Sequence, residues 1–142
     1  MRDRDNLAGV TVLVGEDDAI IGLDLVSTLE ACGARVIGPV PTARSLCRLA
    51  AEADYDVAVF DVHLTDGVVF PAAEAAVDRG RPIVFCSGDF PAQELKRAFP
   101  TSSFFRKPYA MDAVCACVAA VCSNLGARAS DRQTVNQLMT AA

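Results

Sequence analysis

The sequence lacks the features of a nucleic-acid-binding or membrane-spanning protein. It has no tryptophan, one histidine and no run of basic residues, and its formal net charge is −5. A nucleic-acid-binding surface needs a stripe of Lys and Arg, so no nucleic-acid partner is expected. No apolar stretch approaches the roughly 20 residues that span a bilayer, and residues 1–6 lack the apolar core of a signal peptide. We therefore expect a cytoplasmic protein with no membrane contact.

The cysteines also lack the spacing of a metal site. Cys115 and Cys117 form only a C-x-C pair, and His63, the one histidine, leaves few partners for zinc. The six cysteines are Cys32, Cys47, Cys86, Cys115, Cys117 and Cys122. Because they lie within apolar patterns, we expect reduced thiols that pack as small hydrophobic side chains, with a redox role as the alternative.

What the sequence does contain is a regular alternation of apolar runs and amphipathic segments. Of its 142 residues, 52% are hydrophobic and 22% are charged, which is enough for one buried core. The expected strands cover residues 10–14, 35–38, 57–61, 82–86 and 103–106. The expected helices run from the cap Asp18 to Gly33, from the cap Thr42 to Ala53, from Pro71 to Gly80, and over residues 91–98 and 111–125. Such alternation predicts a parallel sheet with helices on both faces, because right-handed crossovers permit little else.

Two of the connections are expected to be loops. Pro39 and Pro41 punctuate the segment after the second strand, which predicts that this strand ends at Gly38. Residues 62–67, with the sequence VHLTDG, are expected to lead as a loop from the third strand into the alanine-rich helix.

Polar side chains follow four of the five expected strands. They are Glu16, Asp17, Asp61, Ser87 and Lys107. The carboxyl ends of parallel strands meet at one edge of a sheet, where open α/β sheets bind their ligands. Carboxylates that lie close together repel one another and are costly to bury, so the acidic members predict a hard divalent cation with oxygen ligands, Mg²⁺ first.

With these residues the sequence resembles the receiver domain of two-component response regulators. The resemblance rests on residues 12–18 (VLVGEDD), 59–61 (VFD), 85–88 (FCSG) and 104–108 (FFRKP). It covers roughly residues 8–125 and implies a flavodoxin-like (βα)5 three-layer sandwich, with a five-stranded parallel sheet of order 2-1-3-4-5. Residues 126–142 are then a C-terminal tail that could form a short helix, with no effector domain.

The resemblance implies that Asp61 accepts a phosphoryl group from a histidine kinase or a histidine phosphotransfer protein. Mg²⁺ would be held by Glu16, Asp17, Asp61 and the backbone carbonyl of His63. Lys107 would pair with the phosphoryl oxygens as a compact cation. The protein would then be a stand-alone signalling phosphoacceptor, which catalyses only its own phosphorylation and dephosphorylation.

The resemblance also implies switch residues and partner surfaces. Ser87 matches the hydroxyl that moves towards the phosphoryl group, and Phe104 matches the aromatic that changes rotamer with it, although Phe lacks the hydroxyl of a Tyr. A downstream protein would bind the face formed by residues 91–98, 103–106 and 111–125. Phosphorylation could also produce a homodimer. The kinase would dock on the first helix, on the side chains of Ile20, Ile21 and Leu23.

Some residues depart from the family pattern. The segment after Asp61 lacks the Met-Pro pair common there, and Gly15 stands where a branched residue is more usual. The helix over residues 91–98 is short and flanked by prolines, which suggests an altered output face. A further hypothesis is that the side chains of His63 and Asp89 control water access to the acyl phosphate and therefore its lifetime.

Other functions fit the sequence less well. A pseudo-receiver, an interaction module that signals without phosphate, would not need the complete set of acids, hydroxyl and lysine. A hydrolase of the aspartyl-phosphate type usually carries a second Asp two residues after the first, where this chain has His63. A histidine phosphocarrier would place its histidine on an exposed helix face. A flavodoxin-like cofactor binder needs a Gly-rich phosphate loop after the first strand, and none is present.

Overall fold

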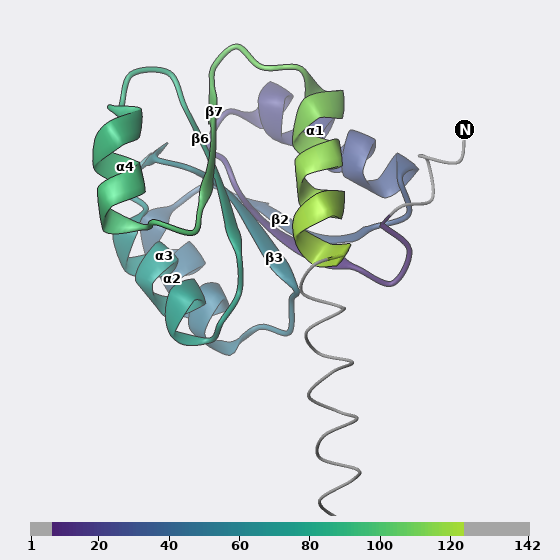
Figure 1. Cartoon of the computed structure of the whole chain (residues 1–142), viewed down its shortest axis with the longest axis horizontal. Helices are drawn as coiled ribbons and strands as arrows, with labels where there is room; N and C mark the ends of the chain where they lie inside the picture. Colours follow the sequence, from purple (N-terminus) through teal and green to yellow (C-terminus); the bar gives the residue numbers. More distant parts are fainter. Residues whose placement is uncertain (1–6, 124–142) are drawn as a thin grey trace, which may run out of the picture.

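The computed structural model describes residues 7–123, and the predicted tail (residues 126–142) lies outside this range. Five parallel strands form one sheet (Figure 1). They are β1 (Thr11–Gly15), β2 (Arg35–Val40), β3 (Val57–Asp61), β6 (Ile83–Ser87) and β7 (Ser103–Arg106). Their spatial order is β2-β1-β3-β6-β7, and every neighbouring pair is parallel, which confirms the predicted order 2-1-3-4-5.

Five helical segments cover the two faces of this sheet. They are α1 (Ala19–Ala31), α2 (Ala43–Glu52), α3 (Phe70–Asp78), α4 (Ala92–Ala98) and residues 111–123. Both predicted N-caps are confirmed. The Asp18 carboxylate accepts hydrogen bonds from the amides of Ile20 and Ile21 at 2.9 and 3.0 Å, and the Thr42 hydroxyl accepts one from the amide of Ser45 at 3.3 Å.

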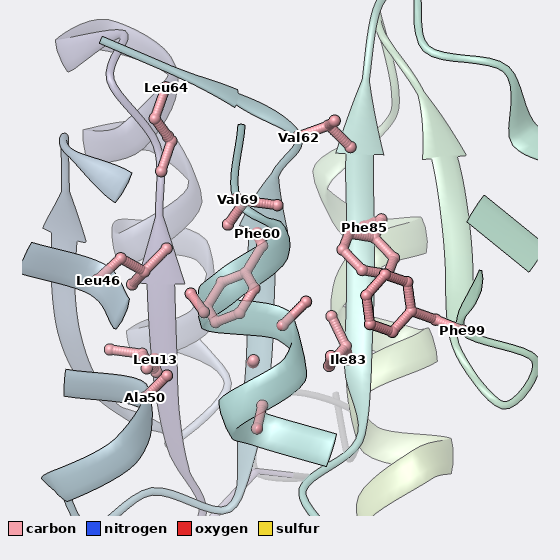
Figure 2. Packing of buried hydrophobic residues seen from close by; sticks show 14 of the residues in the cluster. Leu13, Leu46, Ala50, Phe60, Val62, Leu64, Val69, Ile83, Phe85 and Phe99 are labelled. Atoms are coloured by element: carbon pink, nitrogen blue, oxygen red, sulfur yellow. The ribbon is translucent and has the colours of Figure 1, made fainter. Parts of the chain in front are cut away.

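The side chains of the strands divide the core into two clusters, one on each face. Strand residues alternate between the faces, so Phe60 packs with α2, α3 and α4 while Val59 packs with α1 and residues 111–123. Figure 2 shows the first cluster, in which the Phe85 and Phe99 rings lie with centroids 5.2 Å apart. Every residue of β3 and β6 is buried, as expected for central strands with helices on both sides. The three-layer prediction is therefore confirmed.

The end of β2 differs from the prediction. The strand continues through Pro39 to Val40 instead of ending at Gly38. β2 lies at the edge of the sheet, and its pairing with β1 shifts register between Leu13 and Gly15. A proline, which has no amide hydrogen to give to a ladder, is tolerated at such a position.

The segment after β3 is also more ordered than predicted. Instead of a plain loop, it forms a small antiparallel hairpin of β4 (His63–Leu64) and β5 (Gly67–Val68), joined by a turn at Thr65 and Asp66. Gly67 has a φ of 145°, a backbone conformation that favours glycine. Strands of two residues are too short to produce a readable alternation of apolar and polar residues, so sequence reasoning missed the hairpin.

All six cysteines are free thiols, as predicted. Cys86 and Cys115 are buried, and burial raises the pKa of each thiol to about 12. Such thiols carry almost no thiolate at neutral pH and are poor nucleophiles. Among residues 7–123, no helix has both the length and the apolar character that crossing a membrane requires.

Gly15, which departs from the family pattern, is explained by its neighbours. A Cβ at this position would overlap Cδ2 of Leu46 and lie 3.3 Å from Cδ1 of Phe60, and both side chains are fully buried. We expect Gly15→Val to lower the free energy of unfolding by about 1–3 kcal/mol, because the packed core cannot move aside freely. Urea denaturation measures the loss. Gly88→Val is the matched control, since a Cβ there meets no atom within 4 Å; equal stability of the two variants would contradict the explanation.

Candidate functional site

The register of the sheet brings the predicted site residues to one edge. Gly15 of β1 pairs with Phe60 of β3, so the next residues, Glu16 and Asp61, are neighbours. Asp61 pairs with Cys86 of β6, and Ser87 pairs with Arg106 of β7. The backbone amide of Lys107 donates to the carbonyl of Ser87 at 2.8 Å, which fixes the start of the segment after β7. The ends of β1, β3, β6 and β7, which are neighbours in this order, therefore present two acids, a hydroxyl and an amine.

Lys107 joins the two buried acids. Its Nζ lies 2.9 Å from Oδ2 of Asp61 and 3.0 Å from Oε1 of Glu16. Asp61 is 8% exposed and Glu16 is 3% exposed. The second oxygen of each acid accepts from the backbone: Oε2 of Glu16 from the Asp18 amide at 3.1 Å, and Oδ1 of Asp61 from the His63 amide at 3.3 Å.

The local environment alters the pKa of two of these groups. Burial raises the pKa of Glu16, and hydrogen bonds from the Asp18 amide and from Lys107 offset only part of that effect. Burial alone would lower the pKa of Lys107, but hydrogen bonds to Asp61 and Glu16 outweigh it, so the pKa is raised. Lys107 is therefore a permanent cation at neutral pH, while Glu16 is held in a site that disfavours its charge.

The three acids that the sequence assigned to a metal lie together. Glu16, Asp17 and Asp61 can each offer a carboxylate oxygen, and these oxygens all lie within 4.8 Å of one another; no other such group of possible ligands occurs among residues 7–123. Asp17 is exposed, so the cluster opens to solvent on one side. Three carboxylates face a single ammonium, which leaves excess negative charge. Hard oxygen donors with excess negative charge fit Mg²⁺ well.

The two predicted switch residues lie on neighbouring strands. Ser87 is fully buried, and its Oγ accepts from the amide of Phe90 at 3.2 Å. Phe104 is half-buried on β7 and pairs with Phe85 of β6. Ser87 therefore lies at the acidic edge, whereas Phe104 lies further back along the sheet.

His63 and Asp89 are brought together as the sequence hypothesis required. Nε2 of His63 lies 3.3 Å from Oδ1 of Asp89, and the two side chains are 50% and 83% exposed. The His63 ring also lies 6.1 Å, centroid to centroid, from the ring of Phe90. The pair links the segment after Asp61 to the segment after Ser87.

Sequence reasoning missed two contact residues, Arg106 and Asp66. The Arg106 guanidinium lies 5.3 Å from the centroid of the Phe104 ring and donates to the carbonyls of Gly88 and Phe90 at 3.1 and 3.4 Å. Asp66 accepts from the first amides of α2. The only sequence signal for Arg106 is its position before Lys107, and for Asp66 the Asp-Gly pair typical of a turn.

The fold and this edge of the sheet define a class of protein. No protein-family model matches the sequence, and no curated protein matches it. Solved structures do match, and several of them are receiver domains of response regulators. The chain therefore has the receiver domain fold of response regulators.

Three of these structures show the extent of the similarity. A response regulator receiver protein from Sinorhizobium medicae is 26% identical, with a TM-score of 0.72 over 80% of this chain and 94% of that chain. The non-phosphorylated HemR receiver domain of Leptospira biflexa is 29% identical, with a TM-score of 0.70 over the same shares, 80% and 94%. The response regulator PhyR of Brucella abortus is 22% identical with a TM-score of 0.77, and the match covers 92% of this chain but 54% of that one.

Proposed function

We propose that this chain is a receiver that accepts a phosphoryl group on Asp61 from a histidine kinase or a histidine phosphotransfer protein. The observation that carries the proposal is the geometry at Asp61. Its carboxylate lies at the tip of β3, 2.9 Å from the Lys107 amine and within 4.8 Å of two further carboxylates. The proposed receiver covers residues 8–125, and the protein acts as a signalling module rather than as an enzyme with a separate substrate.

In the proposed reaction, an oxygen of Asp61 attacks phosphorus and the phosphorus–nitrogen bond of the donor phosphohistidine breaks. The donor imidazole leaves with the electron pair of that bond. Lys107 donates hydrogen bonds to the phosphoryl oxygens, and so stabilises the charge that they carry in the transition state. Glu16, Asp17, Asp61 and the backbone carbonyl of His63 would hold Mg²⁺, which when bound neutralises the charge of the approaching phosphoryl group.

The proposed signal leaves the site through the segment after β6. The Ser87 oxygen accepts from the Phe90 amide, and its hydroxyl hydrogen can donate to a phosphoryl oxygen. A shift of Ser87 would move the segment that precedes α4, with Phe104 adjusting beside it. The proposed output surface for a downstream protein is α4, β7 and residues 111–123. Size-exclusion chromatography with and without beryllofluoride measures whether the activated form also dimerises.

The proposed kinase surface is α1. Ile20 is 81% exposed and Leu23 is 61% exposed, although both are large apolar side chains. Both lie in the first two turns of α1, and Ile20 is the third residue after Asp17 of the acidic cluster. A histidine-bearing helix that packed on them would bring its phosphohistidine near Asp61.

The direct test uses the whole chain. Incubation with acetyl phosphate and Mg²⁺, followed by intact mass spectrometry, is expected to show a gain of one phosphoryl group. The gain should disappear when EDTA removes the metal. An unchanged mass, with kinase donors as well as acetyl phosphate, would contradict the proposal and favour the phosphorylation-independent pseudo-receiver.

The contact between His63 and Asp89 predicts an effect on the lifetime of the acyl phosphate. We expect His63→Ala or Asp89→Ala to shorten its half-life, because the proposed role of the pair is to restrict the access of water to the acyl phosphate. A contact worth about 1 kcal/mol corresponds to roughly a fivefold change in rate. The loss of phosphate from labelled protein measures the half-life. The double variant should lose no more than either single variant, since the two side chains act together; unchanged half-lives in all three would disprove the role.

A further inference from the structure

The hairpin of β4 and β5 is attached at its turn to the start of a distant helix. The two carboxylate oxygens of Asp66 accept hydrogen bonds from the amides of Ala43 and Arg44, the first two residues of α2. These amides have no acceptor within the helix. Beside them, the amide of Thr65 donates to the carbonyl of Pro41 at 3.3 Å. The turn therefore depends on α2 for its position.

The other end of the hairpin begins at the acidic edge. His63 is the second residue after Asp61, and its amide donates to Oδ1 of Asp61 at 3.3 Å. The hairpin pairs only His63 with Val68 and Leu64 with Gly67. A two-stranded hairpin of ordinary length is already marginal in water, so one this short needs contacts outside itself to keep a fixed position.

We propose that Asp66 is a positioning residue for the metal site: by attaching the hairpin to α2, it holds the backbone of His63 beside Asp61. This inference rests on the proposed Mg²⁺ site. Asp66 does not reach the acidic cluster itself. It nevertheless contributes to the affinity of that cluster for the ion. His63, which contacts Asp61, and Asp66, which contacts α2, are three residues apart, and the backbone of the hairpin connects them.

An aspartate suits this place for a physical reason. A carboxylate offers two acceptor oxygens to two adjacent amides, and its charge is favourable at the N-terminus of a helix. The hydrogen bond from the Ala43 amide, with a smaller contribution from Arg44, holds the pKa of Asp66 below its ordinary value. Asp66 is therefore ionised at neutral pH.

The same helix end supplies a matched control. The Thr42 hydroxyl also caps α2, by accepting from the amide of Ser45 at 3.3 Å, but it does not bond to the hairpin turn. Thr42→Ala weakens the start of α2 and leaves the Asp66 contacts in place. Asp66→Ala weakens the same helix end and also releases the hairpin.

The experiment compares the whole chain with Asp66→Ala, Asp66→Asn and Thr42→Ala. Isothermal titration with Mg²⁺ alone gives the affinity, and NMR hydrogen exchange gives the protection of the His63 and Thr65 amides. We expect Asp66→Ala to weaken Mg²⁺ binding by about tenfold, the lower end for partners that orient metal ligands, and to speed exchange at both amides. Asp66→Asn, which keeps one acceptor oxygen, should fall between it and the natural protein. Thr42→Ala should change neither readout by more than about twofold.

Three outcomes would overturn parts of the scheme. Equal loss of Mg²⁺ affinity in Asp66→Ala and Thr42→Ala would reduce the role of Asp66 to helix capping. Unchanged exchange at His63 in Asp66→Ala and Asp66→Asn would show that the hairpin does not need its anchor. If the natural protein bound no Mg²⁺, the proposed metal site would fail, and with it the role of Asp66 in that site.

Discussion

Replacing Asp61 with Asn is expected to abolish phosphorylation by acetyl phosphate or by any histidine kinase. The amide keeps the size of the side chain and one oxygen for the Lys107 amine, but its oxygen and nitrogen are far poorer nucleophiles than a carboxylate oxygen. One of the three clustered carboxylates is also lost, so Mg²⁺ binding should weaken as well. Intact mass after incubation with donor and Mg²⁺ measures the result, and peptide mapping locates any label.

The control for this variant is Asp78→Asn. Asp78 is exposed at the end of α3 and forms no ion pair within the part of the chain that the structure describes, so its replacement should leave phosphorylation unchanged. If Asp61→Asn still carried a phosphoryl group at residue 61, Asp61 could not be the acceptor in the way proposed. A label that moved to another residue at full rate would lead to the same conclusion.

The second large effect is expected for Lys107→Met, which removes the amine between two buried acids. Loss of one donor to a developing anion typically slows a reaction by about 10²-fold, so phosphorylation should slow by at least that order. The folded protein should also lose stability, because Glu16 and Asp61 no longer have a cation beside them. Removal of one partner of a fully buried pair costs about 3–5 kcal/mol. Since 21% of the Lys107 side chain is exposed to water, we expect about 2 kcal/mol.

The stability loss in Lys107→Met should depend on pH in a defined direction. The raised pKa of Lys107 means that its contribution is fully present below its ordinary value of 10.5 and is lost as pH rises through the raised value. At acidic pH, protonation of Glu16 removes a negative charge that Lys107 would otherwise neutralise. Because the pKa of Glu16 is raised, this protonation begins at a pH above its ordinary value of 4.5. Urea denaturation across pH should therefore show the largest difference between the two proteins near neutrality, closing at both ends.

Two further measurements make this prediction specific. Mg²⁺ should stabilise Lys107→Met more than the natural protein, because the ion supplies the missing positive charge. Arg97→Met is the control: Arg97 is exposed on α4 and has no ion pair in the described residues, so its loss should change stability little. A difference between natural protein and Lys107→Met that did not change with pH would contradict the electrostatic explanation.

The sheet and the acids at its edge could be predicted from the sequence, because both depend on short, continuous segments of the chain. Residues 57–61 are a continuous apolar run that ends on a carboxylate, and the structure buries all of them as a central strand. The position of Lys107 beside Asp61 followed from the resemblance together with the rule that parallel strands end at one edge. The cluster of three acids followed in the same way, because its members lie directly at the ends of β1 and β3.

The remaining features were not predictable, because they depend on contacts that leave no periodic pattern. Pro39 lies within β2 only because that strand is at the edge and its pairing is irregular. Asp66 accepts a hydrogen bond from an amide 23 residues away, and Arg106 donates one to a carbonyl 18 residues away. A side chain that bonds to the backbone of a distant segment has no characteristic partner residue, so a single sequence gives no sign of it.

The guanidinium of Arg106 has a consequence for recognition. It occupies one face of the Phe104 ring and at the same time satisfies two carbonyl groups in the segment that follows Ser87. A protein that covered this face of the ring would have to displace the guanidinium and leave those carbonyls without their donor. Its binding energy would therefore include the cost of rearranging the segment that follows Ser87. Under the proposed function, phosphorylation of Asp61 moves the same segment and so changes the affinity of such a protein. By thermodynamic reciprocity, binding of that protein would change the equilibrium for phosphorylation by the same factor.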